Sequence, residues 1–464
     1  MNWRSILSYL GLVLVTLSFF MLLPLAVSFV YGEGVYIPFI LGAFVSLALG
    51  TLLSRKFERE PLTLGPAMVL AGITFVTISL IGSIAYLDHL QPIDAVFESV
   101  SGFTTTGLTT VNPETLPYSI LFFRSLTQWI GGIGILVIFL LLLSSPGMSS
   151  YYIYRAEGGT HRIEAGVYST VKRMFMIYGI YTAAGVVLLT LAGMPLFDSL
   201  THTFTSLSTG GFSLKNGSIG SYNSVLVEIV AIFLMILGST SFFLHNRIFR
   251  KDFPEYVKNS ETRLFWVLIA VFSLLLSVSF LSSPEPVRSG VFHAFSALTT
   301  TGYTLGNMTY PELSKLLLIM LMIAGGFAGS TAGGLKLVRV GILGKAMIWV
   351  SKKISYPVSA VIPFKFSGRI VREEELSIIS LFSFIYILVL VLSTLALTFM
   401  GHPPIDSFFV SASAEGTVGL TTIDIAGMNP LAKLILMADM LLGRLEILPF
   451  FVLFYALYSA LRRR

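Results

Sequence analysis

The sequence predicts an all-α integral membrane protein with about ten transmembrane helices, and three observations support this prediction. Of the 464 residues, 55% are hydrophobic and only 12% are charged. A typical soluble domain has about 25% charged residues, so this composition excludes a soluble enzyme. Long apolar runs recur along the whole chain. Four shorter apolar segments, too short to cross a bilayer, lie between the runs at corresponding positions.

The apolar runs define the expected spans, at about 20 residues for each crossing. We expect spans at about 6–30, 36–53, 64–88, 119–144, 174–194, 222–244, 263–283, 313–335, 374–400 and 430–461. The first run follows Arg4 and resembles a signal peptide in that respect. Its length of about 25 apolar residues exceeds the usual hydrophobic region of such a peptide, so we expect a retained span.

The basic residues predict that both termini lie in the cytoplasm. The chain has 30 lysine and arginine residues and a net charge of +6. With a cytoplasmic N-terminus, all but six of these residues fall on inner segments, as the positive-inside rule requires. The six exceptions are Arg124, Lys215, Arg288, Lys315, Lys433 and Arg444. The positive charge therefore reflects membrane topology and does not indicate a nucleic-acid partner.

The residue types also exclude several kinds of catalytic site. The chain has no cysteine, so a disulfide framework, a thiol nucleophile and a thiolate metal site are excluded. The six histidines are scattered and form no HExxH pair. We expect neither enzymatic activity nor a bound cofactor.

A fourfold internal repeat lies between successive pairs of spans, always on the outer side in this topology. Each unit begins with Asp or Ser and reaches a glycine 13 residues later. The units are Asp94–Gly107 (DAVFESVSGFTTTG), Asp198–Gly211 (DSLTHTFTSLSTGG), Ser289–Gly302 (SGVFHAFSALTTTG) and Asp406–Gly419 (DSFFVSASAEGTVG). Such internal repeats indicate one supersecondary unit used several times.

Each unit is expected to begin as a helix and to end as extended chain. A proline lies shortly before each unit, and the residues Asp94, Asp198, Ser289 and Asp406 are all favourable N-caps, so we expect a helix of about ten residues. The Thr-, Ser- and Gly-rich ends favour non-helical backbone. At membrane depth such backbone is tolerated only in a protein interior or beside a water-filled cavity. The pattern therefore predicts a re-entrant pore loop.

Four such loops around one axis would present rings of carbonyl oxygens. These rings can replace the hydration shell of an alkali cation, and the negative C-terminal ends of the helices would favour a cation. A single TTTG sequence is common in loops, and one short apolar segment more often belongs to a helical hairpin. Four units at corresponding positions favour the pore interpretation.

The sequence resembles the Trk/Ktr/HKT superfamily of potassium-translocating membrane subunits over nearly its whole length. The resemblance rests on SGFTTTGLTT, SLSTGGFS, ALTTTGYT and EGTVGLTT, on QWIGGIGILV, and on GGFAGSTAGGLK and LLGRLEIL. It implies four span–pore-helix–span repeats around one central pore, and the two extra N-terminal spans are similar to the TrkH-type branch. The chain would then divide into an N-terminal extension at 1–62 and repeats at 63–173, 174–262, 263–372 and 373–464.

The resemblance implies that main-chain oxygens of four filter segments hold potassium. These segments are Thr105, Thr106, Gly107 and Leu108; Thr209, Gly210, Gly211 and Phe212; Thr300, Thr301, Gly302 and Tyr303; and Thr417, Val418, Gly419 and Leu420. In the family, serine in place of the first filter glycine accompanies sodium preference, so Gly107 indicates potassium. Two departures are Gly210, where the other repeats have Thr or Val, and Glu415 before the fourth filter. Glu415 could attract cations or form a hydrogen bond behind the filter.

The eighth run is interrupted by GGFAGSTAGG at 325–334, immediately before Lys336. Five glycines in ten residues predict unwound helix beside a cavity, although the spacing of Gly325, Gly329 and Gly333 could instead form a helix-packing face. A phosphate-binding loop is excluded because Leu335 occupies the position of its lysine. The resemblance implies a gate below the filter, formed by Gly325, Gly326, Gly329, Ser330, Thr331, Gly333, Gly334 and Lys336.

Arg444 is the one basic residue expected well inside a span. Charges within the membrane usually face the bundle interior or a water-filled path, and they have a partner. Glu446 would lie on a different face of the helix, so we expect the partner elsewhere. Arg444 could hold two spans together through an ion pair or carbonyl groups. The resemblance instead implies a barrier or gate near the pore.

These observations predict a channel-like translocator for potassium uptake, with potassium as its substrate, in the cell membrane. The alternative is a secondary transporter that couples potassium to a proton or sodium, with Asp439 and Glu446 as candidate carboxylates. The cytoplasmic stretches 145–173, 245–262 and 336–372 are too short for a nucleotide-binding domain. The resemblance implies a homodimer that works with a separate cytoplasmic ring subunit, which binds nucleotides.

Overall fold

The structure is a computed structural model that describes residues 2–34, 37–60, 62–144, 167–306, 310–357 and 362–462. This part of the chain is built almost entirely of α-helices, as predicted. Its β-structure is one antiparallel pair of short strands, β1 (Lys365–Phe366) and β2 (Arg369–Ile370). The basic residues Arg155 and Arg162, expected in a cytoplasmic stretch, lie outside the described residues.

A succession of three helices, of which the middle one is short with 12 or 13 residues, occurs four times after two N-terminal helices, α1 (Trp3–Val30) and α2 (Ile37–Lys56). The short helices are α4 (Pro92–Phe103), α8 (Leu196–Leu207), α13 (Pro286–Leu298) and α17 (Pro404–Glu415). The helices before them are α3 (Leu64–Gly82), α7 (Val167–Leu191), α12 (Ser260–Ser279) and α16 (Glu373–Phe399). Those after them are α5 (Tyr118–Ser144), α9 (Val225–Ser239), α14 (Glu312–Ala324) and α18 (Pro430–Arg444). The remaining helices are η1 (Ser83–Tyr86), η2 (Pro113–Thr115), η3 (Ser218–Tyr222), α10 (Phe242–Phe249), α11 (Phe253–Lys258), α15 (Leu337–Ser355) and α19 (Leu448–Arg462).

Each predicted span coincides with helix, but three of the helices that follow a short helix are interrupted. Among the described residues, six helices are long and apolar enough to cross a membrane by themselves. Two bent pairs could make further spans: α9 and α10 meet at 105°, and α18 and α19 meet at 107°. The spans predicted at 222–244 and 430–461 therefore contain a sharp bend in the structure. The mean hydropathy of each pair still fits one span, although both bends fall at polar residues, where the backbone turns at Thr240 and at Glu446–Ile447.

The short helices also start earlier than predicted. Asp94, Asp198 and Asp406 lie in the first turn and are not N-caps, and Ser289 likewise lies inside α13. The reason is that proline at the first helical position has a fixed φ that suits the helix start, as in α4, α13 and α17. The three aspartates still favour the helices, because a negative charge in the first turn interacts well with the helix dipole.

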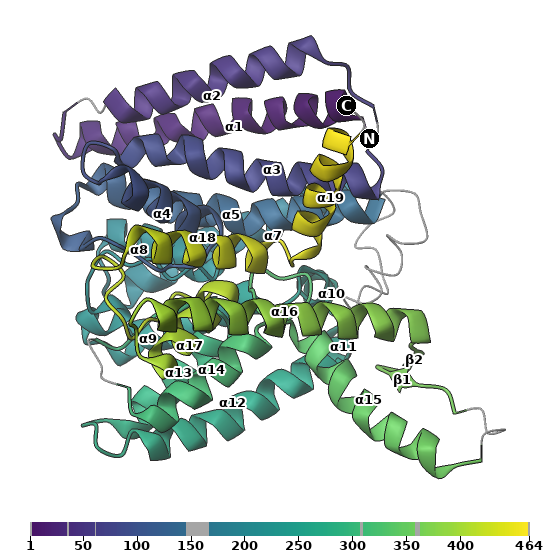
Figure 1. Ribbon diagram of the computed structural model, residues 1–464. Helices are drawn as coiled ribbons and strands as arrows, with labels where there is room; N and C mark the ends of the chain where they lie inside the picture. Colours follow the sequence, from purple (N-terminus) through teal and green to yellow (C-terminus); the bar gives the residue numbers. More distant parts are fainter. Residues whose placement is uncertain are drawn as a thin grey trace.

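The four repeats close into a ring. Each short helix packs against the two flanking helices of its own repeat and against the last of the three helices of the repeat before it: α8 on α5, α13 on α9, α17 on α14, and α4 on α18. The contact between α4 and α18 joins the first repeat to the last, and α19 packs on α3 beside it. The two ends of the chain lie close together at one end of the bundle (Figure 1).

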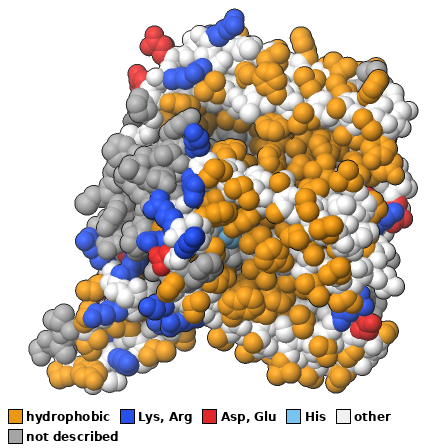
Figure 2. Space-filling model, turned by 180° about the vertical axis from the view of Figure 1, so that it is seen from behind, with side chains coloured by type: hydrophobic (Ala, Val, Ile, Leu, Met, Phe, Trp, Pro, Cys, Tyr) orange, Lys and Arg blue, Asp and Glu red, His pale blue; other side chains and the backbone are white. Residues whose placement is uncertain are grey.

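The surface of the bundle is largely apolar. Phe19 of α1, Leu274 of α12 and Phe384 of α16 are each at least 65% exposed. Figure 2 shows hydrophobic side chains across most of one face, with many lysine and arginine side chains gathered toward one side. Soluble monomers rarely expose continuous apolar patches of more than a few hundred Å², so this surface fits a lipid environment.

Candidate ion-binding site

Each short helix leads directly into one of the four predicted filter segments. These segments are 105–108 after α4, 209–212 after α8, 300–303 after α13 and 417–420 after α17. In every segment the glycine is partly exposed while the other three residues are buried. The four glycines therefore mark the places where the segments meet open space.

The four segments share one backbone conformation. Their first residues have positive φ: 54° at Thr105, 54° at Thr209, 55° at Thr300 and 50° at Thr417. Their glycines also have positive φ: 90° at Gly107, 73° at Gly211, 81° at Gly302 and 97° at Gly419. Non-glycine residues with positive φ are uncommon and β-branched ones are outliers, so strained threonines at four corresponding positions indicate a functional constraint.

The amide groups of each segment point back to its own short helix. In the first repeat, the N–H groups of Thr105 and Thr106 donate to the carbonyls of Gly102 and Ser101 at 3.0 and 2.9 Å. Thr301 repeats the second bond to Ser296, and Val418 repeats it to Ser413. The N–H and C=O of a planar trans peptide point in opposite directions. The carbonyls preceding these amides are therefore directed away from the short helices.

The four segments touch in a closed cycle. A Cβ atom added at the positive-φ glycine of any segment would overlap the main-chain carbonyl oxygen of the second residue in another segment. Gly107 abuts Gly210, Gly211 abuts Thr301, Gly302 abuts Val418, and Gly419 abuts Thr106. The order is thus first, second, third and fourth repeat, and then the first again. Glycine is required at each position by the close approach as well as by φ.

The segment 325–336 is non-helical and lies directly against the filter segments. The Thr331 hydroxyl lies 3.3 Å from that of Thr209, and the Gly333 N–H donates to the Thr300 hydroxyl at 2.9 Å. A Cβ atom on Gly333 would overlap the hydroxyl of Thr417. The loop therefore contacts the first residue of three of the four filter segments.

Other residues of this loop hold it in a folded-back shape. Gly325, Gly329 and Gly334 have positive φ, and a Cβ on Gly326 would overlap Ala332. The Ser330 hydroxyl donates to the Phe327 carbonyl at 2.6 Å, and the buried Lys336 ammonium donates to the Ala332 carbonyl. All eight predicted loop residues thus lie in one compact segment, and the spacing that could have formed a helix face does not lie on a helix.

Arg444 connects this loop to the first repeat. Its guanidinium donates to the Thr331 carbonyl at 2.6 Å and to the Gly131 carbonyl at 2.7 Å. It is 3% exposed and is the last residue of α18, at the bend before α19. Arg444 therefore lies at the bend within the predicted span 430–461. Glu446 lies in the bend and pairs with Arg339 at 2.5 Å.

Glu415 is the last residue of α17, and its side chain is completely buried. Neither carboxylate oxygen has a hydrogen-bond partner among the described residues. Burial without a partner strongly disfavours a charged carboxylate.

Ion pairs join three of the four repeat boundaries at the starts of the short helices. Asp94 of α4 pairs with Lys433 of α18 at 2.6 Å, and Asp406 of α17 pairs with Lys315 of α14 at 2.8 Å. Arg288 of α13 pairs with Glu228 of α9. Burial raises the pKa of the Asp406 carboxyl, but the Lys315 ammonium outweighs this effect and holds the pKa below its ordinary value.

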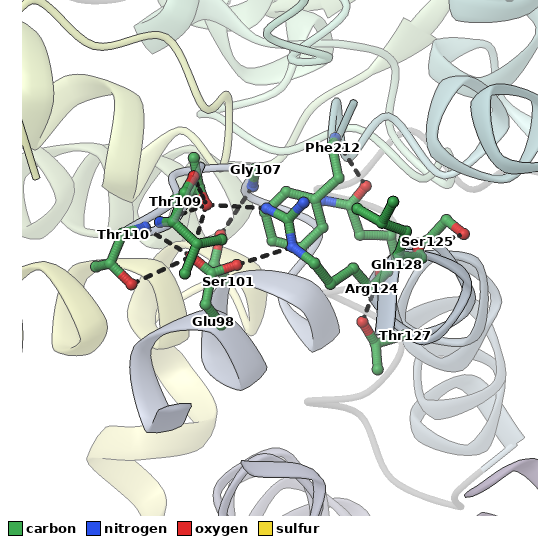
Figure 3. Close-up of polar contacts among 12 residues, drawn as sticks. Glu98, Ser101, Gly107, Thr109, Thr110, Arg124, Ser125, Thr127, Gln128 and Phe212 are labelled. Carbon is green, nitrogen blue, oxygen red and sulfur yellow. Dashed lines mark hydrogen bonds and ion pairs between the residues drawn. The ribbon is translucent and has the colours of Figure 1, made fainter. Parts of the chain in front are cut away.

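The boundary between the first and second repeats is built differently, and its key residues were not predicted. Arg124 of α5 donates to Glu98 at 3.0 Å and lies 4.0 Å from the centre of the Phe212 ring (Figure 3). Gln128, one turn further along α5, bonds to the filter segment of the second repeat. A glutamine within an apolar span is the sequence signal that could have singled out Gln128 within QWIGGIGILV, because a buried polar group needs hydrogen-bond partners.

These features define a multi-pass membrane protein built around a ring of four short helices, each followed by a non-helical segment. The family model of the TrkH cation transport proteins matches residues 38–460, which is most of the chain. The chain therefore belongs to the TrkH family of cation transport proteins.

Known relatives match the chain over nearly its full length. An uncharacterised cation transporter of Methanocaldococcus jannaschii is 35% identical, over 98% of this chain and 96% of its own. The Trk system potassium uptake protein TrkH of Escherichia coli K12 is 32% identical, over 98% of this chain and 99% of its own. The crystal structure of the potassium transporter TrkH from Vibrio parahaemolyticus matches with a TM-score of 0.89 and 30% identity, over 98% of each chain.

Proposed function

We propose that this protein takes up potassium across the cell membrane, through a filter formed by the segments 105–108, 209–212, 300–303 and 417–420. The observation that carries the proposal is the closed cycle in which each filter glycine abuts a carbonyl of the next repeat. Carbonyl groups directed away from the four short helices can replace the hydration shell of an alkali cation. Its potassium-transporting relatives support the choice of ion.

We also propose that the loop 325–336 gates this path. Its contacts with Thr209, Thr300 and Thr417 leave it directly beneath the filter, where a shift of the loop would open or block passage. Arg444 holds the loop through the Thr331 carbonyl and thereby stabilises the closed position. In this proposal Arg444 acts as a carbonyl clamp and as part of the gate.

The proposal also includes the membrane topology, the division into repeats and the partners of the protein. We place both termini in the cytoplasm, because the basic residues then lie on inner segments, and the structure has both chain ends at one end of the bundle. We keep the division into an extension at 1–62 and four repeats ending at 173, 262, 372 and 464. A homodimer and a nucleotide-binding ring subunit on the cytoplasmic face complete the proposal.

The test is uptake of radioactive rubidium and sodium into proteoliposomes under an imposed voltage, for the wild type and for Gly107→Ser. Saturable rubidium flux that follows voltage, with lower selectivity against sodium in the variant, is the expected result. Rubidium flux that requires a proton or sodium gradient would favour the coupled transporter. No flux in either protein, with both folded and inserted, would contradict the filter.

A further inference from the structure

The filter segment of the second repeat is held by a side chain from the first repeat. Gln128 has no exposed surface. Its Nε2 donates to the Gly210 carbonyl at 2.7 Å, and its Oε1 accepts from the Phe212 N–H at 3.1 Å. The two partners fix the orientation of the amide, because a backbone N–H must face the oxygen and a carbonyl must face the nitrogen.

The contact makes one filter carbonyl different from the other three. The carbonyl groups of Gly210, Thr106, Thr301 and Val418 occupy corresponding places in the cycle of segments. Within the described residues, no hydrogen bond from the protein reaches the carbonyls of Thr106, Thr301 or Val418. Only the carbonyl of Gly210 accepts one there, from Gln128.

The corresponding positions in the other repeats hold methionine. Gln128 lies three residues before Gly131, and Met235 and Met440 lie three residues before Gly238 and Gly443. These glycines occupy equivalent places, because each backs onto the carbonyl of the last residue of the short helix in its own repeat: Phe103, Leu207 and Glu415. The third repeat has Met322 three residues before Gly325.

The second residue of each filter segment depends on which residue occupies this helix position, glutamine or methionine. Where the helix position holds methionine, the second residue of the filter segment has a branched side chain, as at Thr106, Thr301 and Val418. Where it holds glutamine, the second residue is Gly210. A Cβ atom on Gly210 would overlap the side-chain amide of Gln128. The amide therefore occupies the space of the side chain that the second segment lacks.

We propose that Gln128 is a positioning residue that makes the proposed filter asymmetric and keeps the ring of carbonyls from Thr106, Gly210, Thr301 and Val418 from binding the ion too tightly. The inference rests on the proposed function. The hydrogen bond from Gln128 draws electron density from the Gly210 carbonyl and competes with the ion for it. Conduction requires binding that is favourable enough for entry and weak enough for release. The three carbonyls that accept no hydrogen bond favour ion entry. The Gly210 carbonyl, which also accepts from Gln128, weakens binding enough for release.

The experiment converts this boundary into the type found at the other three. The double variant Gln128→Met with Gly210→Thr removes the donor and fills the space it leaves. Rubidium uptake into proteoliposomes is measured over a range of rubidium concentrations for the wild type, for Gln128→Met and for the double variant. Trp129→Phe, on the same helix but with its ring nitrogen bonded to Thr182, is the matched control.

We expect the half-saturating rubidium concentration to fall by about tenfold in the double variant, the factor that one buried hydrogen bond of about 1.4 kcal/mol supplies. The maximal rate should fall as well, because tighter binding slows release. Gln128→Met should show the same two changes, and Trp129→Phe neither.

Two outcomes would overturn the inference. A folded double variant with unchanged or weaker rubidium binding would mean that Gln128 only fills space. A double variant that does not fold would contradict the equivalence of the four boundaries. A wild type without saturable rubidium flux would instead contradict the proposed function.

Discussion

The two layers at the centre of this protein are built in opposite ways. The filter layer, residues 105–108, 209–212, 300–303 and 417–420, repeats one backbone conformation four times. The layer beneath it takes three different forms: α5 is a continuous helix, α9 and α18 end in sharp bends, and α14 gives way to the loop 325–336. Coordination of one ion by several carbonyls favours near-equivalent ligands, whereas a gate needs one element free to move. The comparison supports the proposal that the regular layer selects the ion and the irregular layer controls its passage.

The largest effect is expected in the filter layer, for Gly302→Ala. A methyl group there would overlap the Val418 carbonyl, and φ of 81° disfavours any residue other than glycine. Because both obstacles are backbone, the ring must distort, and we expect rubidium flux to fall to background in proteoliposomes.

Gly401→Ala is the matched control, since Gly401 also has positive φ, 96°, but has open space around it. Its flux should stay near the wild-type value. Equal loss of flux in both variants would mean that strain, and not ring closure, is responsible.

The next effect is expected in the layer beneath, for Arg444→Gln. The change removes a charged donor from the carbonyls of Thr331 and Gly131, at a cost to stability of about 3 kcal/mol. We expect a lower melting temperature in detergent and a higher basal rubidium flux, because the loop is released. The rubidium-to-sodium flux ratio should not change. A changed ratio would contradict the proposal that selectivity and gating belong to separate layers.

A smaller effect is expected for Thr331→Val, which keeps the shape of the side chain. The hydroxyl lies 2.9 Å from both the Leu207 and the Gly238 carbonyls, and its loss should cost about 1 kcal/mol. Basal flux should rise less than in Arg444→Gln, at an unchanged ion ratio. Thr394→Val, which removes a bond within one helix, is the control. Basal flux below the wild-type value would contradict the gate.

The smallest effect is expected outside both layers, for Lys433→Met. The variant removes the 2.6 Å pair with the partly exposed Asp94 and should cost about 1 kcal/mol, seen as a lower melting temperature. Flux and selectivity should stay as in the wild type. Adding Asp94→Asn should recover part of the loss, since it removes the unpaired charge. A shift in selectivity would show that the outer ion pairs also shape the filter.

Much of the fold and the position of the site could be predicted from the sequence, because both depend on local signals. The four short helices follow prolines, and the unwound segment at 325–334 is rich in glycine. Strained threonines at positions 105, 209, 300 and 417 fall where the repeat places them.

The remaining features depend on contacts between distant residues. The bends after Ser239 and Arg444 fall at short polar stretches, but the mean hydropathy of each helix pair still fits one span and does not reveal the bend. The Gln128 contact with Gly210 joins residues of two repeats, 82 positions apart. The carbonyl partners of Arg444 cannot be predicted from the sequence, because every residue has a main-chain carbonyl.

The contact between α4 and α18 has a consequence for synthesis of the protein. The filter ring closes only when Gly419 reaches Thr106, so three repeats alone leave the cycle of segments open. A chain that emerges from the ribosome and inserts span by span cannot assemble the complete pathway until its last part has entered the bilayer. Under the proposed function, partly made chains therefore lack a complete ion pathway.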